Sequence, residues 1–588
     1  MSTTTIPSVR TDSPAKAWLR ALELTSSIGK NPGRILSSLI EEFAATDGER
    51  PALLSDCESM TYAGLSTRAN QYTLWAMKQG LGKGDTVCLL MPNRPEYLAV
   101  WMGISRTGCA VALLNTNLTG GSLAHCVNLV SPKHVIVTEA LADRLIGIAG
   151  KPKIWIHGVD LEVDQYKGEP LSSAELPTVT IADRALYVYT SGTTGLPKAA
   201  NISHARILQW SLWFAGLMNT GPDDRMYTCL PMYHSVGGIQ ATGAMLAGGG
   251  SVVIRDGFSA SHFWSDIVRW DCTLFQYIGE LCRYLVNTGT NRSETEHRIR
   301  MCCGNGLRPD IWERFQERFR IPRILEFYAA TEGNVSVFNV EGKPGAIGRV
   351  PSYLAHRFPA TLVRFDVDKE EPVRNEHGFC VRCAANETGE ALGKIFDDPS
   401  NAGNRFDGYT SMGESEKKIL RDVFETGDAW FRTGDLLRTD ESGYYYFVDR
   451  IGDTFRWKGE NVSTSEVAEA ICNYPGIQQA IVYGVSVAGS EGKAGMAMIA
   501  AEENVDLGEL RAFLRNRLPD YAQPLFLRFR NQMEVTGTFK YTKTALVGEG
   551  FNPAGAVGAI YFNDRESESL LLLDEELYTH IQSGQVRL

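Results

Sequence analysis

The sequence predicts an α/β fold, with a large N-terminal α/β domain of several subdomains and a small, mobile α+β C-terminal domain. Three observations lead to this prediction. The chain has 588 residues, more than one simple domain usually contains. Short apolar runs alternate with helix-like stretches through its first part. The run DRIGD at residues 449–453 indicates the start of a new unit. We therefore expect domains over residues 1–449 and 450–588.

The elements of the first part follow from local hydrophobic patterns. Apolar runs predict buried strands over residues 86–91, 134–138 and 251–254. Helical spacing predicts helices over residues 122–129 and 311–319. Strands that alternate with helices favour layers around a largely parallel sheet.

The last part has its own local signals. Ser463 and Glu466 have the spacing of a capping box, in front of a run with helical periodicity. A strand is expected over residues 480–485, and a helix over residues 507–517 that ends before Pro519. A domain of about 130–140 residues is of ordinary size.

The composition predicts a globular protein and argues against a nucleic-acid-binding one. Hydrophobic residues make up 44% of the chain and charged residues 22%, which is typical of a globular protein with an ample core. The formal net charge is −11, so we expect no nucleic-acid partner. A nucleotide ligand stays open, because backbone N–H groups and a few cations can bind phosphates.

The most apolar segment, residues 97–114, contains Arg106 near its middle. A membrane-spanning helix needs about 20 predominantly apolar residues, so we expect a buried helix followed by a strand. The first residues show no apolar signal-peptide core. The expected location is cytoplasmic, and peripheral contact with the inner face of the membrane stays open.

The strongest local signal is the run YTSGTTGLPKAA at residues 189–200. Glycines allow the backbone to turn its N–H groups toward an anion, hydroxyls add donors, and lysine adds positive charge. The order of residues does not fit the P-loop pattern, so we predict a phosphate-binding loop of another kind. Its candidate residues are Thr190, Ser191, Gly192, Thr193, Thr194, Gly195 and Lys198.

This run resembles the phosphate loop of the adenylate-forming superfamily, which contains acyl-CoA synthetases, luciferases and adenylation domains. Further segments resemble that family's motifs in the expected order: PMYHS at 231–235, GNG at 304–306, YAATEG at 328–333, TGD at 433–435 and DR at 449–450. Three segments narrow the resemblance to the fatty acid transport protein branch, which includes very-long-chain acyl-CoA synthetases. They are GNGLRPD at 304–310, DRIGDTFRWKGENVS at 449–463 and TGTFKYTK at 536–543.

The resemblance implies roles for single residues. It places Gly304, Asn305, Tyr328 and Thr331 around AMP, Glu332 on Mg²⁺, Asp435 on the ribose, Arg450 on the ribose or phosphate, and His234 in the acyl pocket. Their chemistry agrees, because a carboxylate is a hard ligand suited to Mg²⁺ and can also accept hydroxyl hydrogens. Taken alone, Glu332 would more often be a surface acid, Asp435 a turn residue, His234 a core or surface histidine and Arg450 half of a salt bridge.

The resemblance also implies a catalytic lysine near the C-terminus, together with Lys198, Thr331 and Glu332 as catalytic residues. We assign Lys540, and Lys543 is the competing candidate because the usual spacing after a glycine is altered here. Gly452 is implied as the hinge about which the small domain rotates between two reaction steps. Glycine is suited to that role because its backbone is little restricted.

The implied function is a long-chain or very-long-chain fatty acyl-CoA synthetase that uses ATP, Mg²⁺ and coenzyme A. The acid becomes acyl-AMP with release of pyrophosphate, and CoA then displaces AMP. Two alternatives stay open: an acyl-AMP ligase that loads a carrier protein, and a fatty acid uptake component that acts by vectorial acylation. The apolar run Trp210–Phe214 is a candidate lining of the acyl pocket or, equally, ordinary helix core.

Overall fold

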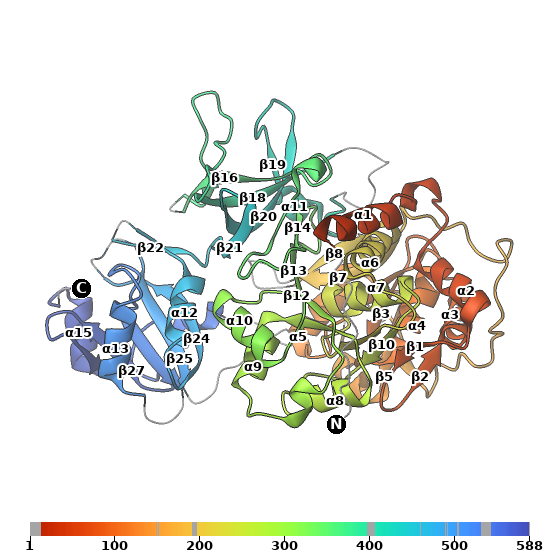
Figure 1. The fold of residues 1–588 in the computed structure, drawn as a ribbon, viewed down its shortest axis with the longest axis horizontal. Coiled ribbons are helices and arrows are strands. Elements are labelled where there is room, and N and C mark those ends of the chain that lie inside the picture. Colours follow the sequence, from red (N-terminus) through yellow and green to blue (C-terminus); the bar gives the residue numbers. More distant parts are fainter. Residues whose placement is uncertain are drawn as a thin grey trace, which may run out of the picture. The chain divides into compact units, whose positions relative to one another are not determined.

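A computed structural model of the chain describes residues 13–148, 150, 152–190, 197–367, 369–396, 406–458, 460–488, 490, 492–501, 505–530, 543–586 and 588. Its residues form two compact units: unit 1 comprises Met1–Pro344 and Lys394–Ile419, and unit 2 comprises Gly345–Gly393 and Leu420–Leu588. The chain thus leaves unit 1, returns to it for one short segment and leaves it again (Figure 1). The boundary expected between residues 449 and 450 lies within unit 2 and stays a prediction.

Unit 1 contains two largely parallel sheets, which confirms the α/β prediction. One has the order β6-β5-β3-β4-β7-β8, in which β8 runs antiparallel to β7. The other runs β2-β1-β10-β9-β11-β12-β13-β14 within this unit, with antiparallel pairs at both ends.

The strands of the first sheet are β3 (Thr86–Leu90), β4 (Ala110–Leu113), β5 (His134–Thr138), β6 (Lys153–His157), β7 (Arg184–Thr190) and β8 (Lys198–Ser203). Those of the second are β1 (Pro51–Leu54), β2 (Ser59–Thr61), β9 (Arg225–Thr228), β10 (Ser251–Ile254), β11 (Leu274–Ile278), β12 (Met301–Asn305), β13 (Ile324–Ala329) and β14 (Ser336–Asn339).

The helices of unit 1 cover these sheets. Those that precede β9 in the sequence are α1 (Pro14–Thr25), α2 (Leu36–Asp47), α3 (Tyr62–Lys78), α4 (Pro95–Ser105), α5 (Gly120–Val130) and α6 (His204–Met218). After it come α7 (Thr242–Ala247), α8 (Phe263–Arg269), α9 (Gly279–Asn287), α10 (Pro309–Arg318) and, in the returning segment, α11 (Met412–Glu416). The helix followed by a strand that was expected over residues 97–114 is confirmed by α4 and β4. Among the described helices, none is both long and apolar enough to cross a membrane.

Helix α6 lies in the core of unit 1, packed against α1 and α7. Trp213 makes an edge contact with Trp18 of α1 at a ring distance of 5.8 Å. Phe214 makes one with Phe327 of β13 at 4.8 Å. Both side chains are buried among these aromatic rings, and a role for the run in lining an acyl pocket stays a prediction.

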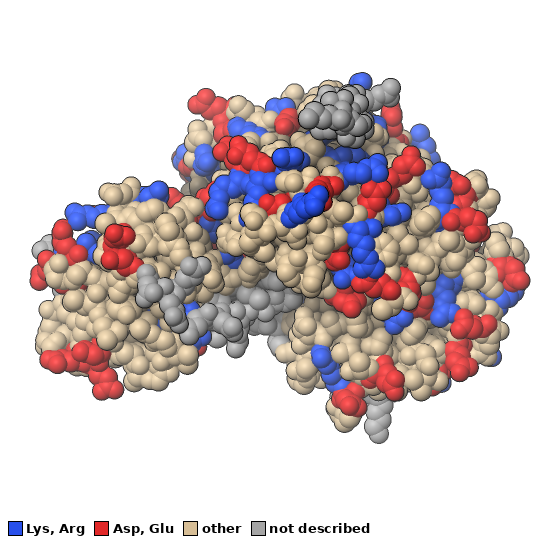
Figure 2. All heavy atoms as spheres, turned by 60° about the horizontal axis from the view of Figure 1, so that its bottom comes forward, with Lys and Arg blue, Asp and Glu red and all other residues tan. Residues whose placement is uncertain are grey.

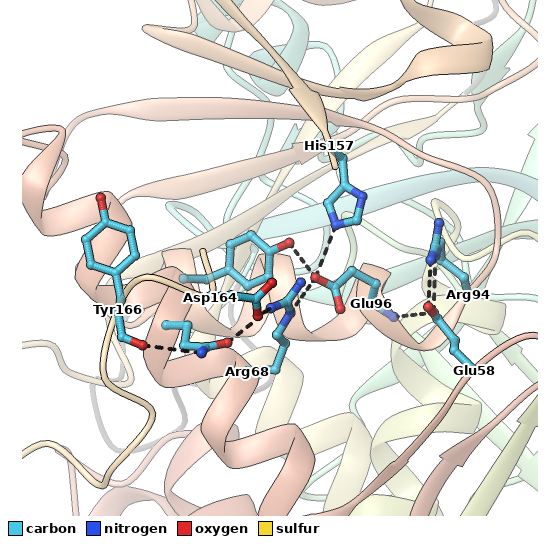
Figure 3. A network of polar contacts seen from close by, with 9 residues as sticks. Glu58, Arg68, Arg94, Glu96, His157, Asp164 and Tyr166 are labelled. Atoms are coloured by element: carbon cyan, nitrogen blue, oxygen red, sulfur yellow. Dashed lines mark hydrogen bonds and ion pairs between the residues drawn. The ribbon is translucent and has the colours of Figure 1, made fainter. Parts of the chain in front are cut away.

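A polar network joins α3, α4 and β6 of unit 1 (Figure 3). At its centre is Glu96 of α4, which accepts hydrogen bonds from Arg68 Nε at 2.7 Å and from the Tyr72 hydroxyl, both on α3. His157 of β6 lies 3.2 Å from the same carboxylate oxygen. Burial alone would raise the pKa of Glu96, but the hydrogen bonds and the charge of Arg68 lower it to about 2.

Unit 2 begins with a sheet of order β17-β16-β18-β20-β21-β15, in which β19 also pairs with β20. Its strands are β15 (Gly348–Arg349), β16 (Ala360–Asp366), β17 (Glu371–Pro372), β18 (Thr388–Lys394), β19 (Ile419–Arg421), β20 (Ala429–Thr439) and β21 (Tyr444–Arg450).

The rest of unit 2 has its own mixed sheet of order β24-β25-β26-β27-β28 and its own hydrophobic core over residues 455–581. Its elements are the hairpin β22 (Phe455–Trp457) and β23 (Glu460–Val462), the strands β24 (Ile477–Val485), β25 (Ala494–Ala501), β26 (Phe526–Arg530), β27 (Ile560–Asp564) and β28 (Ser569–Leu572), and the helices α12 (Thr464–Cys472), α13 (Leu507–Arg515), α14 (Lys543–Glu549) and α15 (Glu575–Gln582). As predicted, Ser463 caps α12, accepting the N–H of Glu466 at 3.2 Å.

On the face shown in Figure 2, basic and acidic residues are interspersed rather than gathered by sign.

Candidate active site

The predicted phosphate loop joins two neighbouring strands of the first sheet. Thr190 ends β7 and Lys198 begins β8, and the two residues are partners in the antiparallel register. Ser191, Gly192, Thr193, Thr194 and Gly195 lie outside the described residues. The strand pairing therefore brings both ends of the loop together, with Lys198 at one of them.

Lys198 has a partner that the sequence did not suggest. Its ammonium group forms an ion pair with the carboxylate of Glu414 on α11, in the segment that returns to unit 1. It also lies 5.7 Å from the ring centre of Tyr409 in the same segment. The returning segment thus supplies one side of the phosphate-loop region.

Thr331 and Glu332 follow β13 in the second sheet. Contacts within unit 1 link Thr331 to the PMYHS segment and Glu332 to the segment that returns to unit 1. The hydroxyls of Thr331 and Ser235 lie 3.2 Å apart. The hydroxyl of Tyr409 donates to Oε1 of Glu332 at 2.7 Å. Tyr409 therefore contacts both the predicted magnesium ligand and the lysine of the phosphate loop.

A buried arginine, Arg206 of α6, lies beneath this loop. Its Nη1 donates to the carbonyl oxygen of Thr331 at 3.2 Å and to that of Gly333 at 2.6 Å. Its Nε lies 3.8 Å from the carboxylate of Asp407. Burial lowers the pKa of Arg206, and the negative charges of Asp407 and Glu332 oppose that effect.

Arg206, Tyr409 and Glu414 were missed by the sequence analysis. For Arg206 a usable signal existed: a charge within an apolar helix must find buried partners. For Tyr409 and Glu414 the local sequence carries no such signal.

The segment at 304–306, which was predicted to lie around AMP, begins at the end of β12. A Cβ on Gly304 would come within 2.2 Å of the Tyr277 carbonyl oxygen, so this close approach of two strands requires glycine. The next residue, Asn305, has a buried side-chain oxygen that finds no hydrogen-bond partner among the described residues. Tyr328 is on β13, which pairs with β12.

Glu326 of β13 holds the turn that follows Asn305. Its Oε1 accepts the N–H of Leu307 at 3.1 Å, and its Oε2 accepts the hydroxyl hydrogen of Tyr277. Burial raises the pKa of Glu326 to about 8, although both hydrogen bonds act in the opposite direction. This carboxyl group therefore carries its proton at neutral pH.

His234 lies in the turn before the short π-helix Val236–Ala241, and its ring is 4.6 Å from that of Tyr233. It is half-buried. Its neighbour Ser235 contacts Thr331, so the segment adjoins the site in unit 1. A role for His234 in binding an acyl chain stays a prediction.

In unit 2, Asp435 of β20 and Arg450 of β21 are register partners. Nε of Arg450 lies 3.5 Å from Oδ1 of Asp435, and the arginine side chain is 49% exposed. The salt-bridge interpretation of Arg450 thus applies, and its partner is another predicted site residue. Their contacts with a nucleotide stay predictions.

Gly452 follows in a turn closed by the N–H of Asp453, which donates to the Arg450 carbonyl oxygen at 3.0 Å. Its φ of +89° lies in the left-handed region, and none of the described atoms would lie within 4 Å of a Cβ at this position. Lys540 lies outside the described residues. The competing candidate, Lys543, donates to Asp453 at 3.0 Å and to the Thr464 hydroxyl at 2.8 Å.

Comparison with known proteins shows the family and the fold of the chain. A family model described as "AMP-binding enzyme" matches residues 40–378, and one described as "AMP-binding enzyme C-terminal domain" matches residues 466–540. The solved structure of ATP-bound MatB from Rhodopseudomonas palustris covers 87% of this chain, and 98% of that structure is covered, with a TM-score of 0.73 and 23% identity. The structure of the anthranilate CoA ligase AuaEII in complex with anthranoyl-AMP covers 88% of this chain, and 97% of that structure is covered, with a TM-score of 0.74 and 19% identity. At such identity the structures show a shared fold.

The chain therefore belongs to the AMP-binding enzyme family and is an adenylate-forming ligase. Within that family it is a member of the long-chain fatty acid transport protein branch. "Long-chain fatty acid transport protein 1" of Homo sapiens is 40% identical over 572 residues, 94% of this chain and 88% of the relative. "Long-chain fatty acid transport protein 6" of Mus musculus is 38% identical over 575 residues, 94% of this chain and 92% of the relative.

Proposed function

We propose that this protein is an AMP-forming ligase of long-chain or very-long-chain fatty acids and coenzyme A. The observation that carries the proposal is that, in unit 1, Tyr409 contacts both Lys198 and Glu332. Thr331, the residue before Glu332, lies with its hydroxyl 3.2 Å from that of Ser235. The names of the relatives, long-chain fatty acid transport proteins, supply the substrate class.

The residues present fit Mg²⁺ bound together with ATP. Among the described residues, no cluster of three or more His, Cys, Asp or Glu side chains could hold a metal ion. Mg²⁺ bound with ATP needs no such cluster, because it is held by one or two carboxylates, water and phosphate oxygens. Glu332 would be that carboxylate. When bound, the ion would neutralise charge on the phosphate oxygens.

The residues also fit the nucleotide. The buried side-chain oxygen of Asn305 can accept a hydrogen from the exocyclic amino group of adenine. Asp435 can accept the ribose hydroxyl hydrogens, and Lys198 can exchange Glu414 for phosphate oxygens. Among the described residues the Asn305 oxygen has no partner, and a hydrogen bond from the nucleotide would offset the free-energy cost of burying it.

In the first step a carboxylate oxygen of the acid attacks the α-phosphorus of ATP, and pyrophosphate leaves. Negative charge grows on the phosphate oxygens, where Lys198, the hydroxyl of Thr190 and Lys540 can stabilise it. The product is acyl-AMP, a mixed anhydride. In the second step the sulfur of CoA attacks the acyl carbon, and AMP leaves.

Two further functions stay as alternatives. Acyl-AMP could be delivered to the thiol of a carrier protein instead of CoA. Uptake of fatty acids would follow from the proposed activity without a pore, because the CoA ester traps the acid. We further propose a cytoplasmic enzyme that contacts the membrane peripherally, where its apolar substrate dissolves.

A panel of acids of graded chain length tests the proposal, with AMP, pyrophosphate and CoA thioester all measured. We expect AMP and pyrophosphate in equal amounts, an absolute need for Mg²⁺, and kcat/KM rising with length. Each buried CH₂ contributes about 0.8 kcal/mol, or roughly fourfold, until the pocket is full. ADP and orthophosphate as products would contradict the mechanism, and a preference for short or aromatic acids would contradict the substrate class. AMP release without thioester formation would favour the carrier alternative.

A further inference from the structure

A metal-binding carboxylate needs neighbours that fix its orientation, and hydrogen bonds to such ligands commonly do so. In unit 1 the hydroxyl of Tyr409 donates to Oε1 of Glu332 at 2.7 Å. This bond uses one lone pair of the carboxylate, which retains others for a metal ion. The geometry is that of a side chain that orients a ligand without touching the metal.

Tyr409 is itself held by the strand that carries Lys198. It forms an isolated antiparallel bridge with Ala200 of β8. On either side of it, Asn201 donates its N–H to the Gly408 carbonyl at 2.9 Å, and Thr410 donates to that of Ala199 at 3.1 Å. The side chain is largely buried. The position of the hydroxyl is therefore set by backbone pairing two residues after Lys198.

The loop that bears Glu332 is fixed from below. Arg206 binds the carbonyl oxygens on both sides of Glu332, those of Thr331 and Gly333. Asp407, two residues before Tyr409, lies 3.8 Å from Arg206 and accepts the hydroxyl hydrogen of Ser203 at 3.1 Å. Arg206 thus fixes the backbone on both sides of Glu332. The side-chain torsions of Glu332 are then restrained by the hydrogen bond from Tyr409.

We propose that Tyr409 is a positioning residue that orients the Glu332 carboxylate for the Mg²⁺ bound with ATP. The proposal rests on the proposed function for the identity of that ion. It predicts that loss of the hydroxyl weakens the binding of Mg²⁺ more than the binding of the nucleotide.

The test is a Mg²⁺ titration of Tyr409→Phe in the presence of α,β-methylene ATP, which cannot transfer its adenylyl group because a CH₂ replaces the oxygen between the α- and β-phosphorus atoms. The readout is the rise in melting temperature, supported by the Mg²⁺ dependence of ATP–pyrophosphate exchange. Losing such a hydrogen bond typically weakens metal binding 10- to 100-fold, so we expect the Mg²⁺ midpoint to rise at least about tenfold. Phe keeps the ring, and circular dichroism checks the fold.

Tyr227→Phe is the matched control. It removes another tyrosine–carboxylate hydrogen bond of unit 1, from Tyr227 to Asp266 at 3.2 Å, and should leave the midpoint unchanged. A folded Tyr409→Phe protein with the wild-type midpoint would overturn the proposal. So would an equal shift in the control.

A double-mutant cycle asks whether Tyr409 acts through Glu332. Glu332→Gln should abolish most of the Mg²⁺ dependence, and adding Tyr409→Phe to it should change little more. Independent, additive losses would overturn the proposal. If the wild-type protein binds Mg²⁺ with the analogue but activates no acid, the proposed function fails, while the titration still decides the role of Tyr409.

Discussion

Glu326 is a carboxyl group in the interior of unit 1, where an ionised form is strongly disfavoured. The folded protein keeps its proton up to about pH 8, whereas the unfolded chain releases it near the ordinary value of 4.5. The folded state therefore binds more protons between these two values. The contribution of Glu326 to stability therefore falls as the pH rises from about 4.5 to about 8, and it is constant above that.

Glu326→Gln should remove this dependence, because an amide is neutral at every pH and can still accept the N–H of Leu307. We expect the variant to gain stability relative to the wild type between pH 5 and pH 8, by up to about 4 kcal/mol. Urea unfolding at several pH values measures it. Parallel pH profiles for the two proteins would show that Glu326 is not the group responsible.

Among single residues, the sequence could single out candidates that lie within contiguous motifs. Each of these motifs can be recognised because it occupies one short stretch of sequence. Unit 1 contains four of the candidates, namely Thr190, Lys198, Thr331 and Glu332. Tyr409 could not be predicted, because its role depends on pairing with Ala200, far away along the chain. The pattern around Trp213 also could not separate a ligand pocket from core, since both bury apolar rings.

At the scale of elements, short apolar runs were reliable. The runs at 134–138 and 251–254 coincide with β5 and β10. The order of strands within each sheet could not be obtained this way. The pairing of β1 with β10 joins segments that no local pattern relates. The helix α11 was not anticipated, although Ser411 caps it by accepting the N–H of Glu414.

That helix leads to a second prediction. Glu414 pairs with Lys198 and, at 2.6 Å, with Lys417, so it competes with incoming phosphates for the Lys198 charge. Glu414→Gln should lower the KM for ATP by about two- to fivefold, as expected from losing one partly exposed ion pair. Steady-state kinetics at fixed acid concentration measures the change.

Glu175→Gln provides the control, because it breaks a Lys–Glu ion pair on another segment, with Lys167 at 2.6 Å. It should leave the KM for ATP unchanged. A higher KM in Glu414→Gln would mean that Glu414 supports nucleotide binding instead of competing with it.

At the scale of the whole molecule, the proposed reaction needs two arrangements of the small domain. Lys540 must reach the α-phosphate in the first step, and CoA must reach the acyl carbon in the second. Gly452 is suited to the change, because its φ of +89° is accessible to glycine and excluded for proline. Lys543, the competing candidate, donates to Asp453, and the choice between the two lysines stays a prediction.

Lys540→Ala should cripple acyl-AMP formation and leave thioester formation from supplied acyl-AMP largely intact. Gly452→Pro should do the reverse if the adenylating arrangement is still reached, and Gly452→Ala should have a smaller effect. Each half-reaction is assayed separately on protein of verified fold. Equal loss of both half-reactions in each variant would show that the two arrangements cannot be separated in this way.

The return of residues Lys394–Ile419 to unit 1 has a consequence for synthesis on the ribosome. Asn201 of β8 binds the Asp407 carbonyl oxygen, 206 residues further along the chain. At roughly 5–20 residues per second, the ribosome needs on the order of 10–40 s to make that stretch. During this time the nascent chain already contains Lys198 but has no Tyr409 to complete the site. The emerging protein therefore cannot assemble its nucleotide site before most of the chain has been translated.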